Sequence, residues 1–450
     1  MQASRRSVLV LGSVLVTLLA TPASPTAALV AERAVSGALD PTFATKGTLE
    51  LPGGESIADG PAGSLWVLGS VVHTDGVTRY LNRFTGNGAV DRTFVGATQT
   101  SNAVDLTVGP ILTNPAGGAA YAVNRCCRTK RPPISQVAVH TVSASGIRPA
   151  GAAGTVQWPL SAVVPKADAD ADYVIGGVVR LSDGRMRACV SVYPGGERDP
   201  FAALVGFRAD GTVDATVGAA DRTMPAVGWT KLTGIDDCGF ASAGLQQLFV
   251  DGSDRLYVLG PASGRTPTAT RVIRTSAAGV ADPTYGVAGA ATVRSPTRSY
   301  SPLTATITRA GVLYLGLSSK DAKAKATAVA TVVKLTAAGT RATGFGRNAV
   351  RRFFPTGGSS ELDSIELLPE GRLAVGVVYT SGGLRTGKLM AVSSATAART
   401  ESFGVHGSIV TGTLTWDILV RDGYLLTIGS RIPADPAAYL GATVLQRRRL

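Results

Sequence analysis

An internal repeat constrains the fold of this chain more than any other feature of its sequence. Its clearest part is the segment Ala-Leu-Asp-Pro-Thr-Phe at 38–43, which returns in altered form along the chain. Good copies lie at 89–94, 212–218 and 280–286, weaker ones at 343–346 and 401–404, and an eroded one at 146–151. The repeats start near residues 37, 88, 146, 211, 279, 339 and 398. We therefore expect seven supersecondary units of about 60 residues each.

Each repeat continues with two further elements. The first is a Gly or Asp turn followed by an alternating apolar strand, as in Gly-Ser-Leu-Trp-Val-Leu-Gly at 63–69 and Asp-Arg-Leu-Tyr-Val-Leu-Gly at 254–260. The second is an apolar strand that ends in a turn containing Gly, as at 79–88 and 201–211. Alternation with period two predicts strands, and a unit of this length can hold four antiparallel strands of ordinary size.

The Asp and the aromatic residue of the repeated segment have different expected roles. The Asp side chain accepts hydrogen bonds from nearby backbone amides and so favours a turn. The aromatic residue three positions later is suited to a wedge between neighbouring sheets. A sheet with two apolar faces cannot bury both alone, whereas copies packed radially bury all of them. The sequence predicts an all-β fold, a single β-propeller of seven blades with four antiparallel strands each. A linear solenoid is the alternative.

These phrases resemble the delta-sixty repeat family of exported bacterial proteins. The resemblance covers residues 37–450 and is best in repeats one, four and five. Repeat three lacks both the Asp and the aromatic residue, and repeat seven has Thr400 in place of the Asp, so the local turn departs from the family pattern there. The resemblance implies a β-propeller and an exported location, and it implies no catalytic residues.

Residues 1–28 are expected to be a signal peptide. Arg5 and Arg6 precede a 13-residue apolar run at 8–20 and a stretch of small residues and prolines. Residues 4–9 resemble a twin-arginine export signal, and ordinary Sec export is the alternative. The run is shorter than the ~20 residues that span a bilayer. We expect a secreted, extracellular or envelope-associated protein without a membrane span. Residues 29–36 form an N-terminal segment that could add a strand to a blade.

The chain is basic, with 44 Lys and Arg against 31 Asp and Glu and a formal net charge of +13. Such a charge fits attraction to an acidic envelope polymer. The basic residues are scattered, however, and an Arg-rich solvated surface is the simpler interpretation. The sequence contains no recognisable nucleic-acid-binding module, and no nucleic-acid partner is expected.

The four cysteines, Cys126, Cys127, Cys189 and Cys238, lie in repeats two, three and four. An even number of cysteines in an exported chain predicts disulfides. Because consecutive blades are neighbours, we expect bridges between repeats two and three and between repeats three and four. Free thiols are an alternative, and a four-cysteine metal site lacks the usual paired short spacing.

Other patterns indicate no defined chemistry. Asp168, Asp170 and Asp172 form D-x-D-x-D, but the Gly and the final Glu of a calcium loop are absent, so an acidic loop is expected. Calcium is the only cofactor that the sequence suggests at all. The G-x-G-x-x-A match at 344–349 belongs to the repeat and is not a dinucleotide site. No catalytic, cofactor-binding or metal-binding residue is assigned.

The histidines and tryptophans indicate no shared site. His73, His140 and His406 fall in different repeats, which argues against a catalytic triad. Trp66 lies in an alternating strand and is expected in the core. The other three tryptophans belong to the core or to one face of the ring, where they could stack on a sugar or a partner: Trp158, Trp229 and Trp416.

The sequence favours a binding or scaffold module whose partner is an unknown envelope polymer, glycan or protein. The expected surface includes the long insertions of repeats two, three and four, such as 126–133 and 197–200. A carbohydrate-active hydrolase or lyase at the propeller mouth is the first alternative, and acidic residues clustered around the channel would favour it. An apolar and basic lining would favour binding. A purely structural envelope protein is the second alternative.

Overall fold

The computed structural model describes most of one compact unit of the chain, Val35–Leu450. The described residues are 37–73, 76–94, 97–101, 105–108, 110–114, 116–125, 136–145, 155–159, 172–193, 199–218, 228–238, 246–262, 269–295, 298–321, 328–353, 358–433 and 442–450. They form seven antiparallel sheets, two 3₁₀ turns, η1 (Pro61–Gly63) and η4 (Pro369–Gly371), and no α-helix. The predicted all-β propeller of seven blades is therefore confirmed.

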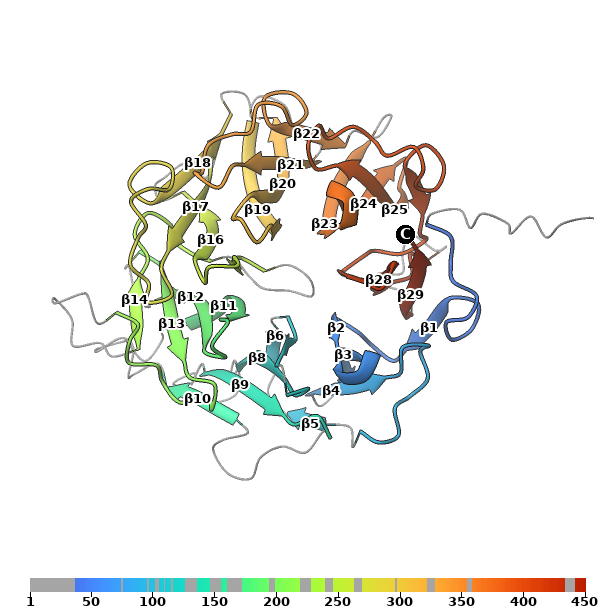
Figure 1. Ribbon diagram of the computed structural model, residues 1–450, viewed down its shortest axis with the longest axis horizontal. Helices are drawn as coiled ribbons and strands as arrows, with labels where there is room; N and C mark the ends of the chain where they lie inside the picture. The colour runs from blue at the N-terminus through green and yellow to red at the C-terminus, as the bar shows by residue number, and fades with distance from the viewer. Residues whose placement is uncertain are drawn as a thin grey trace, which may run out of the picture. The chain divides into compact units, whose positions relative to one another are not determined.

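The sheets surround a common axis, and each sheet is one blade (Figure 1). From the innermost strand outward, blades 1 to 3 are β2 (Ser56–Asp59), β3 (Leu65–His73), β4 (Gly76–Phe84) and β5 (Ala97–Ser101); β6 (Asp105–Val108) with β7 (Leu112–Thr113), β8 (Ala119–Arg125), β9 (Gln136–Val142) and β10 (Thr155–Pro159); β11 (Asp172–Arg180), β12 (Met186–Tyr193), β13 (Phe201–Phe207) and β14 (Trp229–Lys231). In blade 2, both β6 and β7 pair with β8, so its innermost strand is interrupted.

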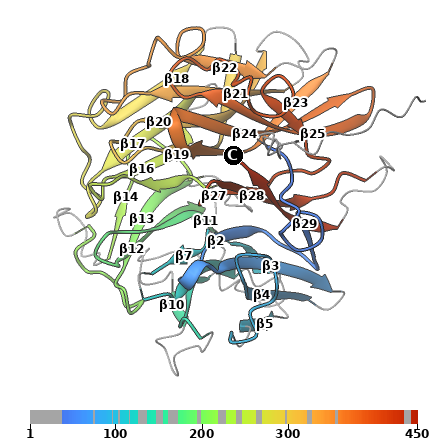
Figure 2. The ribbon, with the colours of Figure 1, turned by 45° about the vertical axis from the view of Figure 1, so that its right-hand side comes forward.

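The remaining blades repeat the same meander, and Figure 2 shows their strands from a second direction. Blades 4 to 7 are β15 (Leu248–Val250), β16 (Leu256–Pro261), β17 (Ala269–Thr275) and β18 (Ala290–Arg294); β19 (Arg298–Ile307), β20 (Leu313–Asp321), β21 (Val329–Leu335) and β22 (Val350–Phe353); β23 (Ser359–Leu368), β24 (Arg372–Ser381), β25 (Leu384–Ser393) and β26 (Ser408–Val410); β27 (Asp417–Arg421), β28 (Tyr424–Ser430), β29 (Thr443–Arg449) and β1 (Thr48–Leu51).

The first described strand closes the ring. β1 pairs with β29 from Thr48 opposite Gln446 to Leu51 opposite Thr443, so blade 7 combines three C-terminal strands with one N-terminal strand. The repeated segment at 38–43 thus precedes the outermost strand of the neighbouring blade, and repeat and blade are offset by one strand. The segment 29–36, a candidate for an additional strand, lies outside the described residues.

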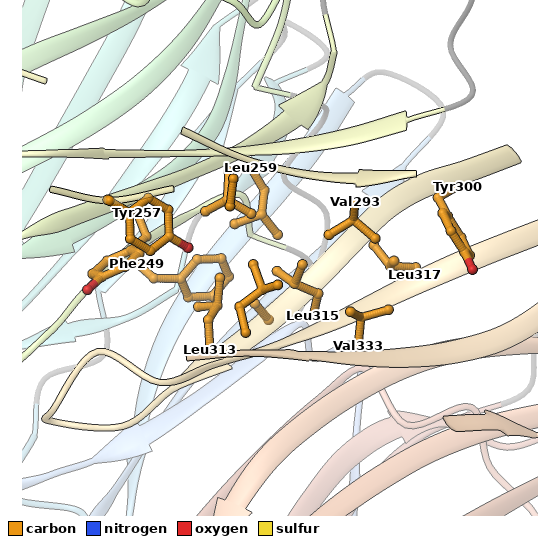
Figure 3. Close-up of a cluster of buried hydrophobic side chains, with 14 of the residues drawn as sticks. Phe249, Tyr257, Leu259, Val293, Tyr300, Leu313, Leu315, Leu317 and Val333 are labelled. Atoms are coloured by element: carbon orange, nitrogen blue, oxygen red, sulfur yellow. The ribbon is translucent and has the colours of Figure 1, made fainter. Parts of the chain in front are cut away.

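The core lies between the blades. Between blades 4 and 5, Phe249, Tyr257 and Leu259 of one sheet pack against Leu313 and Leu315 of the next (Figure 3). This arrangement explains the near-continuous apolar runs in the second and third strands, because the neighbouring blades cover both faces of these strands. The aromatic residue of the repeated segment also enters these layers and is buried at all five of its positions: Phe43, Phe94, Tyr285, Phe345 and Phe403.

The Asp of the repeated segment forms the expected turn. In each described case its Oδ1 accepts hydrogen bonds from the backbone N–H and the hydroxyl of the Thr two residues later, as Asp214 does from Thr216 at 3.1 and 2.7 Å. The same geometry is found at three further positions: Asp40, Asp91 and Asp282.

Each of these Asp residues also pairs with a basic side chain of an adjacent strand. Arg274 of β17 lies 2.8 Å from Asp282, and its other nitrogen donates to the carbonyl of Ala337 in blade 5 at 2.6 Å. Its guanidinium covers the ring of Tyr285 at 4.7 Å. Arg83 and Arg447 repeat this arrangement in blades 1 and 7. The basic residue therefore holds a turn and links two blades together.

The expected bridge between repeats three and four is present. Cys189 of β12 is bonded to Cys238, which lies between β14 and β15, and their Cα atoms are 6.1 Å apart. Both residues are buried in the layer between blades 3 and 4. Cys126 and Cys127, the candidates for the other bridge, lie outside the described residues.

Candidate functional site

Among the acidic residues on the innermost strands of blades 6 and 7, three have carboxyl groups that protein surrounds: Asp363 and Glu366 on β23, and Asp417 at the start of β27. The innermost strands border the central axis of the propeller (Figure 1), and we call them the inner wall. All three residues are partly exposed, although protein surrounds their carboxyl groups. Three carboxyl groups that protein surrounds, on two adjacent blades, form a distinctive chemical feature of the described residues.

Asp363 occupies a β-bulge. The register of β23 against β24 shifts between Leu362 and Ser364, which leaves Asp363 without a cross-strand partner and redirects its side chain. Its Oδ2 accepts a hydrogen bond from the backbone N–H of Thr415 in the approach to blade 7, at 3.2 Å. Burial raises the pKa of Asp363 to about 7, and the negative charge of Glu361 adds to the rise.

Asp417 joins the blades on either side of the ring closure. Its Oδ2 accepts hydrogen bonds from the hydroxyl of Ser56 at 2.9 Å and the backbone N–H of Ile57 at 3.0 Å, both on the innermost strand of blade 1. Its Oδ1 accepts from the N–H of Ile418 at 2.8 Å. Burial nevertheless raises the pKa of Asp417 to about 6, because it outweighs the hydrogen bonds that favour the charged form.

Glu366 is the least restrained of the three carboxyl groups. The hydroxyl of Thr306 on β19 lies 3.5 Å from its Oε2, at the limit of a hydrogen bond. Burial raises the pKa of Glu366 to about 8, and the negative charge of Asp417 contributes to the rise. Glu366 is therefore mostly protonated at neutral pH, whereas Asp417 is mostly ionised.

This arrangement places hydrogen-bond donors and acceptors on one part of the inner wall. A protonated carboxyl group both donates and accepts, and an ionised one accepts only. The hydroxyls of Ser56 and Thr306 extend the polar surface across blades 5, 6, 7 and 1. Among the described residues, no group of three or more His, Cys, Asp and Glu side chains is arranged to hold a metal ion.

A cavity of about 280 Å³ lies elsewhere, at the seam between blades 7 and 1. Its lining includes Leu65, Asn87, Tyr424, Arg421 and Arg447. Both guanidinium groups are already engaged, that of Arg421 with the carbonyl of Ser64 and that of Arg447 with Asp40. The cavity therefore offers mainly apolar surface and fewer available polar groups than the inner wall.

The tryptophans and histidines do not gather at this site. Trp66 and Trp229 are buried in the core, and Trp416 is half-buried directly before Asp417. The side chain of Trp158 is outside the described residues. Of the histidines, His140 is buried in blade 2 and stacks on Tyr121, and His406 is exposed in a turn of blade 6 beside Glu401. Only the backbone of His73 is described, at the end of β3.

The other sequence candidates lie mostly beyond the described part of the chain. Asp168 and Asp170 are not described, and Asp172 is described only as the first backbone position of β11. The insertion at 126–133 is not described, and only Asp199 and Pro200 of the insertion at 197–200 are. The segment 344–349 forms a tight turn in which Gly346 has a φ of 57°, and it opens no helix.

Sequence reasoning did not select Asp363, Glu366 or Asp417. The available signal is the segment Ser-Ser-Glu-Leu-Asp-Ser-Ile-Glu-Leu-Leu of β23, where acidic residues interrupt a strand that should be apolar. Without the register of the innermost strands, acidic residues of the inner wall cannot be distinguished from those on a solvated edge.

No family model matches the chain, and no curated protein matches it. Among solved structures it is similar to the polysaccharide lyase Uly1, with 10% identity and a TM-score of 0.48 over 91% of this chain and 92% of that one. It is also similar to an acylaminoacyl peptidase from Pyrococcus horikoshii, with 9% identity and a TM-score of 0.43 over 88% of this chain and 52% of the peptidase. Sqt1 from Chaetomium thermophilum has 11% identity and a TM-score of 0.41 over 88% and 96%. The fold assignment depends on the strand pairing and not on these alignments.

Proposed function

We propose that this protein is an exported propeller of the delta-sixty repeat type that binds a hydroxyl-rich ligand, such as a saccharide, at the inner wall of blades 5, 6, 7 and 1. The observation that carries the proposal is the group of three carboxyls with raised pKa values at Asp363, Glu366 and Asp417. Glu366 and Asp417, whose charges interact, present a neutral and an ionised carboxyl group, which can donate to some hydroxyls of a sugar and accept from others.

Export is supported by the apolar run at 8–20 and by the Cys189–Cys238 disulfide, since disulfides persist in oxidising compartments. Among the described residues, no helix is long and apolar enough to cross a membrane.

A second candidate function is general acid–base cleavage of the bound saccharide. The raised pKa values of Glu366, about 8, and Asp417, about 6, favour it, because an acid and a base with separated pKa values are what such chemistry requires. The acidic inner wall is also the feature that the hydrolase or lyase alternative requires. Binding remains the first candidate because Asp363 and Asp417 are held by backbone N–H groups of the following blade.

The test is a thermal-shift titration of the purified protein with envelope and environmental saccharides at pH 5.5, 7 and 8.5. A saccharide bound by the native state raises Tm by mass action. Glu366→Gln should abolish the shift, whereas Glu370→Gln, an exposed change in the same blade, should retain it. A full shift in Glu366→Gln, or no shift with any saccharide, would contradict the proposal. Smaller products from a bound saccharide would favour the second candidate.

A further inference from the structure

A group of basic side chains lies where blades 5 and 6 pack together, away from the inner wall. It consists of Arg351 on β22, Lys388 on β25 and Arg399 in the turn before β26, and the charges of both arginines act electrostatically on Tyr379 of β24. Lys388 Nζ lies 5.2 Å from the centre of the Tyr379 ring. Burial raises the pKa of Tyr379, and the positive charges of Arg399 and Arg351 oppose that rise.

Both blades hold this cluster in place. Tyr379 lies on the face of blade 6 that packs against blade 5, against the hydrophobic cluster that includes the buried Phe353. The guanidinium of Arg351 lies 5.8 Å from the centre of the Phe353 ring. Lys388 lies two residues before the buried Met390 on β25, and residues two apart on a strand share a face, so Lys388 is on the same face as Met390. Arg351 and Lys388 thus each pack over an aromatic ring, and the pairing of the strands fixes where these rings lie.

None of the three basic groups has an acidic partner in the part of the chain that the structure describes. The basic residues of the repeated turns differ, since Arg83, Arg274 and Arg447 each pair with an Asp. Three like charges brought together without a counter-charge repel one another and are stabilised by an external anion. Tyr379 Oη donates only to the sulfur of Met390, at 3.7 Å, which is a weak acceptor that an anion can replace.

We propose that this basic group binds the carboxylate or sulfate groups of an acidic polysaccharide. Arg and Lys side chains form charge-assisted hydrogen bonds to such groups, and the tyrosine hydroxyl supplies a further donor. Arg399 is exposed, while Arg351 and Lys388 are half-buried, so the cluster is open on its solvent side. Three cations from separate elements, open to solvent on one side, suit a chain that carries one charge per sugar unit. The proposal does not depend on the inner-wall site.

The test measures binding of the purified protein, with its Cys189–Cys238 disulfide formed, to defined probes by isothermal titration calorimetry. The probes are oligogalacturonate, a heparin oligosaccharide, neutral dextran and inorganic polyphosphate. We expect binding to at least one of the two acidic saccharides, no binding to dextran, and weaker binding to polyphosphate. Lys388→Gln and Arg399→Gln should each weaken saccharide binding about tenfold, the effect of losing one charge-assisted hydrogen bond.

Arg92→Gln is the matched variant, because Arg92 is an exposed basic residue in the equivalent turn region of blade 1 and carries the same charge change. It should leave the affinity within about twofold of the parent, as expected for a screened distant charge. Equal weakening by Arg92→Gln and Lys388→Gln would overturn the proposal in favour of attraction by net charge alone. Binding to polyphosphate but to neither saccharide, or to no probe, would also overturn it.

Discussion

At the scale of single residues, the ion pair between an Arg and the Asp of the repeated segment is preserved in blade 3, although the Arg occupies a different strand there. In blades 1 and 4 the residue opposite the aromatic of the second strand is Arg, as in Trp66–Arg83 and Tyr257–Arg274. In blade 3 the Arg is instead on the second strand: Arg187 lies opposite Gly206. Gly206 is required there, because a Cβ would lie 2.4 Å from Val217.

The moved guanidinium performs the same task as the others. Arg187 is fully buried, pairs with Asp214 at 2.7 Å and donates to the carbonyl of Ala277 in blade 4 at 2.6 Å. Blade 6 lacks this ion pair altogether. Thr400 takes the place of the Asp in the repeated segment, and Ala391 takes the place that Arg83 has in blade 1. The acid and the base are thus absent together, which avoids leaving a buried charge without its partner.

Arg187→Met tests the importance of this buried pair. The change leaves the carboxylate of Asp214 buried without its main partner, and we expect a loss of about 3 kcal/mol in the free energy of unfolding. Urea denaturation followed by tryptophan fluorescence measures it. Arg185 also approaches Asp214, at 3.3 Å, but its side chain is 34% exposed. Arg185→Met should therefore cost less than about 1 kcal/mol. Similar losses for the two variants would contradict the assigned role of Arg187.

At the scale of elements, the disulfide fastens the middle of blade 3 to the segment that enters blade 4. Cys189 lies on the second strand of its sheet, and Cys238 follows the outermost strand of the same sheet. The bond therefore restrains the linker between blades, next to residues Ile235 and Leu248 of the interblade layer. It acts in addition to the hydrogen bond from Arg187 to the carbonyl of Ala277 across the same pair of blades.

Removal of the disulfide should destabilise the protein by about 4 kcal/mol, the loop-closure entropy expected for the separation of 49 residues. The variants are Cys189→Ala, Cys238→Ala and the double substitution, compared by equilibrium denaturation. Because either single change breaks the same bond, the double variant should lose little more than each single variant. Additive losses from the two single changes would show that the two sulfurs act independently.

Much of this element-level architecture could be predicted from the repeat. The turns at Asp40 and Asp214, the buried Phe43 and the bridge between repeats three and four all agree with the spacing in the sequence. The offset of repeat and blade by one strand could not be predicted, because the pattern of β1 fits either neighbour equally. The role of Arg187 was hidden for another reason: basic residues are scattered along the chain, and only strand register shows which of them meet an Asp.

The site was even less accessible to sequence reasoning. The innermost strands carry register shifts between Leu106 and Val108, between Ile175 and Gly177, and between Leu362 and Ser364. Each bulge changes which side chains of the innermost strand point to which face, so period-two alternation no longer predicts their direction. Asp363 lies at one of these bulges, and Glu366 follows it by three residues.

At the scale of the whole molecule, the ring is closed in two ways near the same place. β1 pairs with β29 at the outer rim of blade 7, and Asp417 links β27 to the innermost strand of blade 1. Asp363 forms a similar link from blade 6 towards blade 7. These links use carboxyl groups whose charge is disfavoured by burial, so the stability of the closed ring depends on pH.

This dependence has a defined direction. Asp417, Asp363 and Glu366 have pKa values raised to about 6, 7 and 8 in the folded chain, from ordinary values of 3.8, 3.8 and 4.5. Their protons are therefore bound more tightly in the folded than in the unfolded state. The resulting stabilisation is complete below the unfolded values and is lost as pH rises through 6 to 8.

Asp214 acts in the opposite sense at lower pH. Burial alone would raise its pKa, but hydrogen bonds from Thr216 and the charge of Arg187 outweigh burial and lower it to about 2. The stability that it contributes is present above its ordinary value of 3.8 and is lost as pH falls towards 2.

The protein should therefore be most stable in mildly acidic solution, with a higher Tm at pH 5 than at pH 8.5. Differential scanning calorimetry across this range measures the slope. Glu366→Gln should flatten the decline at the alkaline end, because a neutral amide cannot lose the proton whose release the folded state resists. Glu370→Gln, on an exposed turn of the same blade, should leave the slope unchanged. A Tm that rises steadily from pH 5 to pH 8.5 would mean that these carboxyl groups are ionised without penalty in the folded protein. Because the saccharide proposal depends on neutral carboxyl groups at pH 7, that outcome would weaken it as well.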